Sequence, residues 1–121
     1  MGIKLVIVDD APFIREVIKQ ILEPTEIQVV AEATDGEEAV ELVLKHKPDV
    51  VLMDIVMPKK SGTEATKEIL ERLPNVRIIA CSTLDQETMV MKALEAGCCH
   101  YVVKPFESKQ LIEAVRSSLK P

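Results

Sequence analysis

The chain has 121 residues, the usual length of one domain, so we expect a single domain over residues 1–121 and no separate effector module. Apolar residues make up 47% of the sequence and charged residues 29%, a balance typical of a globular domain and not of a disordered one. Fifteen basic and twenty acidic residues leave a formal charge of −5, which argues against direct binding of DNA or RNA.

The sequence also argues against membrane insertion and secretion. Its longest apolar runs, such as residues 50–53, span only about four residues, whereas a membrane-spanning helix needs about twenty. The first residues lack the apolar segment of a signal peptide, and the three cysteines are odd in number, with two of them adjacent. We therefore expect a cytoplasmic protein with reduced cysteines.

Short β-branched runs alternate along the chain with longer segments of helical period. The first run is apolar except for Lys4, as expected for a strand buried on both faces of a parallel sheet. Pro12 suits the first turn of the helix that follows, and Gly97 suits the end of the fourth helix. Strands are predicted at residues 3–8, 27–31, 50–53, 76–81 and 99–103. Helices are predicted at residues 12–22, 36–45, 63–73, 86–95 and 108–119.

Five repeats of strand and helix, with connections too long for hairpins, predict a doubly wound α/β fold with a parallel sheet and helices on both faces. In such folds, ligands bind beyond the carboxyl ends of the strands, where the strand order reverses. Polar side chains follow four of the five predicted strands. They are Asp9 and Asp10 after the first strand, Asp54 after the third, Ser82 and Thr83 after the fourth, and Lys104 after the fifth.

Each aspartate alone has a structural explanation; Asp10, for example, can cap the helix that begins near Pro12. Three converging carboxylates are harder to explain, because two of them about 5 Å apart repel by roughly 3 kcal/mol at an effective dielectric near 20. A divalent cation offsets this repulsion. Mg²⁺ is favoured because it takes one or two carboxylates together with a substrate phosphate, and zinc is disfavoured because no Cys/His cluster is present.

The remaining polar residues indicate phosphoryl chemistry. Lys104 supplies a positive charge suited to a phosphoryl oxygen. Asp54 ends the central strand, and a carboxylate can act as a nucleophile that forms an aspartyl phosphate. The sequence has neither a Walker A motif nor a G-x-G-x-x-G motif after the first strand. These features predict a phosphoryl acceptor and not an ATPase.

Five separated motifs, in the same order and four of them at a strand end, resemble the receiver domain of two-component response regulators, above all the stand-alone receivers of chemotaxis. The motifs are Asp9-Asp10, Asp54 in Met-Asp-Ile-Val-Met-Pro, Gly62, Ser82 after Cys81, and Lys104-Pro105-Phe106. The resemblance covers essentially the whole chain. It implies the flavodoxin-like strand order 2-1-3-4-5 with five helices, a cis Lys104–Pro105 bond, and a regulatory domain that is not an enzyme acting on a separate substrate.

The resemblance also assigns roles to single residues. It implies that Asp54 is phosphorylated, that Asp10, Asp54 and the Val56 carbonyl bind Mg²⁺, and that Asp9 acts through metal-bound water. Ser82 and Lys104 are expected to bind the phosphoryl oxygens. Tyr101 matches the aromatic switch position of the family, although its simplest explanation without the family is packing at the sheet edge.

The expected partners are a histidine kinase as phosphodonor and a flagellar motor switch protein or other output protein, with the chain acting as a monomer. Val56 and Leu84 replace polar residues found in some relatives, which predicts a long-lived phosphoprotein and a separate phosphatase.

Three alternative functions remain. An aspartate-nucleophile phosphatase needs an Asp at position 56, an FMN carrier is disfavoured by the negative charge at Asp9-Asp10, and a receiver cut from a longer methylesterase or transcription factor fits the same motifs.

Overall fold

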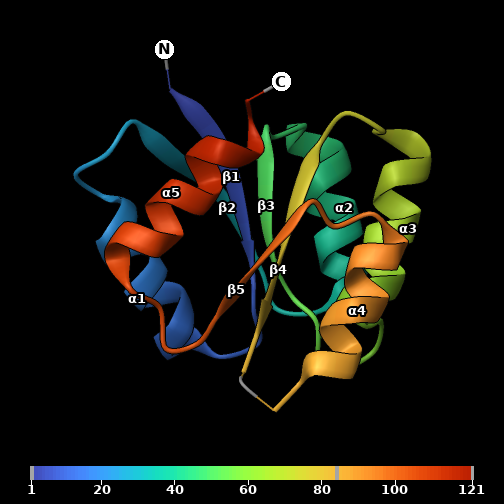
Figure 1. Cartoon of the computed structure of the whole chain (residues 1–121). Coiled ribbons are helices and arrows are strands. Elements are labelled where there is room, and N and C mark those ends of the chain that lie inside the picture. The colour runs from blue at the N-terminus through green and yellow to red at the C-terminus, as the bar shows by residue number, and fades with distance from the viewer. Residues whose placement is uncertain (1, 84, 121) are drawn as a thin grey trace.

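Five strands form one parallel sheet, and a helix follows each strand (Figure 1). The computed structural model describes residues 2–83 and 85–120. The strands are β1 (Ile3–Val8), β2 (Ile27–Ala33), β3 (Val50–Asp54), β4 (Arg77–Ser82) and β5 (His100–Val103). The helices are α1 (Pro12–Leu22), α2 (Gly36–His46), α3 (Gly62–Arg72), α4 (Glu87–Ala96) and α5 (Ser108–Ser118). The strand order β2-β1-β3-β4-β5 confirms the predicted fold class and topology.

Alternate residues of the central strands enter two separate apolar cores, one on each face of the sheet. In β1, Leu5 and Ile7 pack with residues of α1 and α5, whereas Val6 and Val8 pack with residues of α2, α3 and α4. Figure 1 shows the same division, with α1 and α5 on one side of the sheet and the other three helices opposite. Because both faces are covered, the central strands read as continuous apolar runs and not as alternating ones.

The predicted element boundaries agree with the structure to within one residue, except at the end of β2. This edge strand continues two residues beyond the predicted end, to Ala33. The extension includes Glu32, whose carboxylate receives hydrogen bonds from Arg15 and Lys19 of α1 at 3.1 and 3.0 Å. A charged residue on an edge strand lies outside the apolar pattern, and for this reason the pattern predicts a shorter strand. None of the helices in the described ranges is long and apolar enough to cross a membrane.

Candidate functional site

The carboxyl ends of β1 and β3 place the aspartates side by side. Val8 and Met53 are partners in the parallel register of the two strands, so Asp9 and Asp54 follow them at the same edge of the sheet. The carboxylates of Asp9, Asp10 and Asp54 each offer an oxygen atom, and these three oxygens lie within 4.8 Å of one another. The predicted convergence of the three carboxylates is therefore present in the fold.

Lys104 brings a positive charge to this cluster from the end of β5. Its ammonium group lies 2.6 Å from Asp9 Oδ2 and 3.6 Å from Asp54 Oδ2. Its backbone N–H donates to the Ser82 carbonyl at 2.7 Å, and its bond to Pro105 is cis, as the resemblance implies. Burial alone would lower the pKa of Lys104, but the hydrogen bond to Asp9 and the charge of Asp54 outweigh it and raise the pKa.

Asp54 is the buried acceptor candidate of the cluster, with 6% of its surface exposed. Burial and the negative charge of Asp9 raise the pKa of Asp54 to about 6, against the opposing charge of Lys104. The Val56 backbone N–H donates to Asp54 Oδ1 at 3.3 Å. Strongly shifted carboxyl groups in a cleft mark candidate functional sites, since a purely structural role seldom keeps a carboxylate in so unfavourable an environment.

The structure corrects the suggestion that Asp10 caps α1. The residue at the N-cap position is Ala11, and it makes no side-chain cap hydrogen bond. Its backbone N–H instead donates to Asp9 Oδ1 at 2.9 Å. Asp10 is exposed and takes part in the carboxylate cluster, which leaves its oxygens open to a ligand from solvent.

The donor set fits Mg²⁺. Three carboxylates, whose oxygen atoms are hard ligands, meet at one point. The ammonium group of Lys104 contacts two of them, those of Asp9 and Asp54. Mg²⁺ prefers a small number of carboxylates and keeps several water molecules, which the exposed Asp10 side of the cluster can accommodate. The chemistry of these residues thus suits a hydrated divalent cation beside a phosphoryl group.

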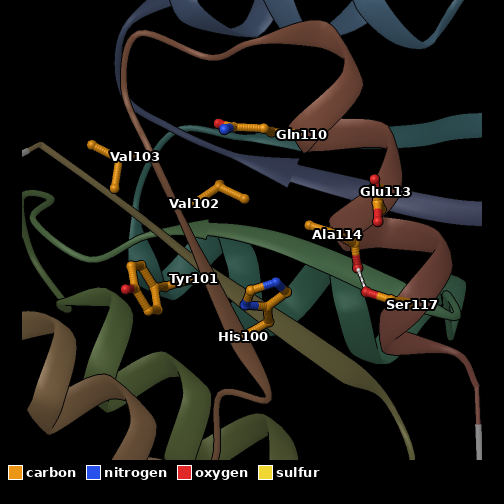
Figure 2. Close-up of a pocket in the computed structure, with 8 residues that line it drawn as sticks. All are labelled: His100, Tyr101, Val102, Val103, Gln110, Glu113, Ala114 and Ser117. Atoms are coloured by element: carbon orange, nitrogen blue, oxygen red, sulfur yellow. Dashed lines mark hydrogen bonds between the residues drawn. The ribbon is translucent and has the colours of Figure 1, made fainter.

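Ser82 and Tyr101 lie on the β4–β5 side of the site. Asp54 pairs with Cys81 in the sheet register, which puts the buried Ser82 one residue further along the same edge. Ser82 and Tyr101 both line a groove of about 350 Å³ between α4 and β5. Tyr101 is 45% exposed. Its ring lies edge to face with the ring of His100, and the two ring centroids are 6.0 Å apart. Figure 2 shows both rings on β5, together with the α5 side chains across the neighbouring groove.

Val56 and Leu84 are the two apolar residues expected near the phosphoryl position. The Val56 side chain is 43% exposed beside Asp54, whereas Leu84 lies outside the described residues. Sequence reasoning missed Arg15, whose guanidinium donates to the Asp9 carbonyl at 2.8 Å and so supports the end of β1. An arginine in the first turns of an amphipathic helix carries no local signal of such a contact.

Comparison with known proteins identifies the family. The response regulator receiver domain family matches residues 5–116, and the chain belongs to this family. The chain is similar to the chemotaxis protein CheY of Thermotoga maritima, with 44% identity over 99% of this chain and 100% of the relative. The response regulator domain of Thermotoga maritima CheB has a TM-score of 0.90 at 36% identity, covering 100% of both chains. A chain of the CheX–CheY–BeF3–Mg²⁺ complex from Borrelia burgdorferi has a TM-score of 0.91 at 32% identity, over 98% of this chain and 90% of that one.

Membership of this family gives the general function. Receiver domains are the regulatory switches of two-component signalling systems, and this chain is such a switch. Neither the aspartate-nucleophile phosphatase nor the FMN carrier accounts for the match to the receiver family. A receiver that forms one domain of a longer regulator remains consistent, because the CheB structure is itself the response regulator domain of CheB.

Proposed function

We propose that Asp54 accepts a phosphoryl group from a histidine kinase and that the chain passes the signal to an output protein in chemotaxis. The observation that carries the proposal is the buried Asp54 carboxylate, which faces two further carboxylates and Lys104 at the carboxyl edge of the sheet. In this reaction an Asp54 oxygen bonds to phosphorus as the bond from phosphorus to the donor's imidazole nitrogen breaks. The chain is then a phosphoacceptor and not an enzyme that turns over a separate substrate.

Each polar residue of the site has a proposed part in this transfer. Asp10, Asp54 and the Val56 carbonyl would hold Mg²⁺ directly, with Asp9 acting through a bound water molecule. When bound, the cation neutralises the carboxylates and stabilises charge on the phosphoryl oxygens. Lys104 lies close enough to Asp54 to bind one of these oxygens, and we assign another to the Ser82 hydroxyl.

The phosphoacceptor role is tested by intact-mass measurement with acetyl phosphate and Mg²⁺. Wild type and Asp85→Asn, which changes an exposed aspartate after β4, should each gain one phosphoryl group. We expect Asp54→Asn, and wild type in excess chelator, to gain none. Phosphorylation of Asp54→Asn at the wild-type rate would remove Asp54 from the acceptor role.

The chemotaxis assignment rests on the full-length similarity to CheY, and we propose a flagellar motor switch protein as the output partner. The chain would act as a monomer in the cytoplasm, where its three free cysteines remain reduced. A pull-down that compares phosphorylated with unphosphorylated protein tests the partner. A reading frame that continues into an effector domain would instead favour the longer regulator.

A further inference from the structure

The loop that joins β3 to α3, residues 55–61, leaves the carboxylate cluster and returns to it. The Gly62 N–H donates to the Ile55 carbonyl at 3.3 Å. A Cβ atom at Gly62 would lie 2.2 Å from the Asp54 carbonyl oxygen, so the end of the loop lies directly against the strand that carries Asp54. Val56 is the second residue of this closed loop. Its backbone position therefore depends on how the rest of the loop is held.

The far side of the loop packs against the turn that joins β2 to α2. Gly36 is buried at the start of α2, and a Cβ atom there would lie 2.0 Å from the Lys60 carbonyl oxygen and 2.6 Å from its carbonyl carbon. These are backbone atoms, so they cannot move aside by a change of rotamer. Any side chain at position 36 has to push the loop away from α2.

Ion pairs also join the loop to the start of α2 and to α3. Asp35 caps α2 by accepting a hydrogen bond from the Glu38 N–H at 2.8 Å, and its other oxygen lies 3.6 Å from the Lys59 ammonium. Lys59 has a left-handed backbone with φ of 66°, which a non-glycine residue adopts only when its surroundings hold it there. Lys60 also forms an ion pair with Glu68 of α3.

We propose that Gly36 is a positioning residue for the Mg²⁺ and phosphoryl site. Because it has no side chain, the start of α2 packs directly against the loop that carries the Val56 carbonyl. The inference rests on the proposed function, since it assigns the loop a role in binding the cation. Groups that orient metal ligands commonly change metal affinity by about 10- to 100-fold when they are altered. Gly36 acts in this way through backbone packing.

The first test compares Gly36→Ala with Gly97→Ala. Gly97 has φ of 121° and its Cβ position lies against Leu70, so this control also strains the backbone, but at the end of α4 and away from the loop. Both variants should lower the midpoint of thermal unfolding. We expect only Gly36→Ala to weaken Mg²⁺ binding, by about tenfold or more in a calorimetric or NMR titration. The Mg²⁺ concentration for half-maximal phosphorylation should shift equally, with the rate at saturating Mg²⁺ largely recovered.

Equal Mg²⁺ affinities in the two variants would overturn the proposal and leave Gly36 with a role in folding alone. The binding titration remains informative whatever the outcome for Asp54→Asn, so failure of the proposed function and failure of this inference are distinguishable.

A second test uses the wild-type chain and does not depend on how a variant folds. If the loop and the turn are coupled, binding of Mg²⁺ must tighten the turn in return, because coupling is reciprocal. We expect Mg²⁺ to slow hydrogen exchange of the Glu38 amide, which donates to the Asp35 carboxylate. The Cys98 amide, which donates to the Ala93 carbonyl of α4, should exchange at an unchanged rate. Unchanged exchange at Glu38 under saturating Mg²⁺ would contradict the coupling.

Discussion

At the scale of single residues, the site holds a buried carboxylate, Asp54, in an unfavourable electrostatic environment. Asp54 is nearly fully buried and has a second carboxylate, Asp9, beside it. Lys104 contacts both groups but carries one positive charge against two negative ones. The remaining imbalance is what a cation would remove, so the same arrangement that favours binding costs stability in the metal-free protein.

The pKa of Asp54 makes this cost measurable. Its pKa in the folded chain is about 6, above the ordinary value of 3.8, so the folded state holds the proton more tightly than the unfolded state. The stabilising contribution is present below pH 4 and is lost as the pH rises through 6. We expect Asp54→Asn to raise the free energy of unfolding by about 1–2 kcal/mol at pH 8 in chelator, after allowance for solvent screening. At pH 4 the difference should nearly vanish, as checked by urea denaturation.

Val56 is expected to govern how long the phosphoryl group persists. Hydrolysis needs a water molecule aligned with the phosphorus, and the half-exposed Val56 side chain cannot hold one by a hydrogen bond. One hydrogen bond contributes about 1 kcal/mol, which corresponds to about fivefold in rate. Val56→Asn should therefore speed loss of phosphate by about that factor with Mg²⁺ affinity unchanged, measured by the decay of intact mass. Equal lifetimes for Val56→Asn and a Val56→Ala control would show that water orientation here is not limiting.

At the scale of elements, the ends of helices show how local sequence determines local structure. Ser61 and Glu64 form a reciprocal capping box at the start of α3, directly after the loop of the site. The end of α2 is less favourable. Lys47 terminates it in the left-handed region, with φ of 48° and its N–H donating to the Val43 carbonyl. Glycine is the residue usually found in this conformation at a helix end.

This position predicts a stabilising substitution. Lys47→Gly removes the steric cost of the left-handed conformation, which exceeds the extra chain entropy of glycine in the unfolded state. We expect the free energy of unfolding to rise by about 0.5–1 kcal/mol. Lys45→Gly, two residues earlier and inside the last turn of α2, should lower it by a similar amount. Urea denaturation of the two variants should give shifts of opposite sign, and shifts of the same sign would contradict this account.

The element scale also explains what could be predicted from the sequence. Parallel strands end at a common edge, so the apolar runs alone were enough to bring Asp9, Asp54 and Lys104 together. The burial that separates Asp54 from the exposed Asp10 depends on neighbouring strands and could not be read from a local pattern. The contact between Gly36 and Lys60 joins segments 24 positions apart and has no periodic signature.

At the scale of the whole molecule, a signal has to travel from the carboxylate cluster to a surface that a partner can recognise. The groove between α4 and β5 reaches from Ser82 to Tyr101, and Met91 on its rim is exposed. A phosphoryl group shifts the protein between two states only by as much as its contacts differ between them. We expect Ser82 to move toward the phosphoryl group and the Tyr101 ring to turn inward toward the groove that both residues line.

Tyr101 should therefore couple phosphorylation to partner binding without affecting phosphorylation itself. Coupling between two sites in one protein typically amounts to 5- to 150-fold in affinity. We expect Tyr101→Ala to be phosphorylated at the wild-type rate, while the ratio of partner affinities with and without phosphate falls to within about twofold of one. Tyr101→Phe keeps the ring and should retain most of the ratio, and His100→Ala, which alters the neighbouring ring on β5, serves as a surface control. An unchanged ratio of partner affinities in Tyr101→Ala would mean that this side chain only packs against the edge of the sheet. A residue that contacts the phosphorylated and unphosphorylated states equally cannot bias the equilibrium between them.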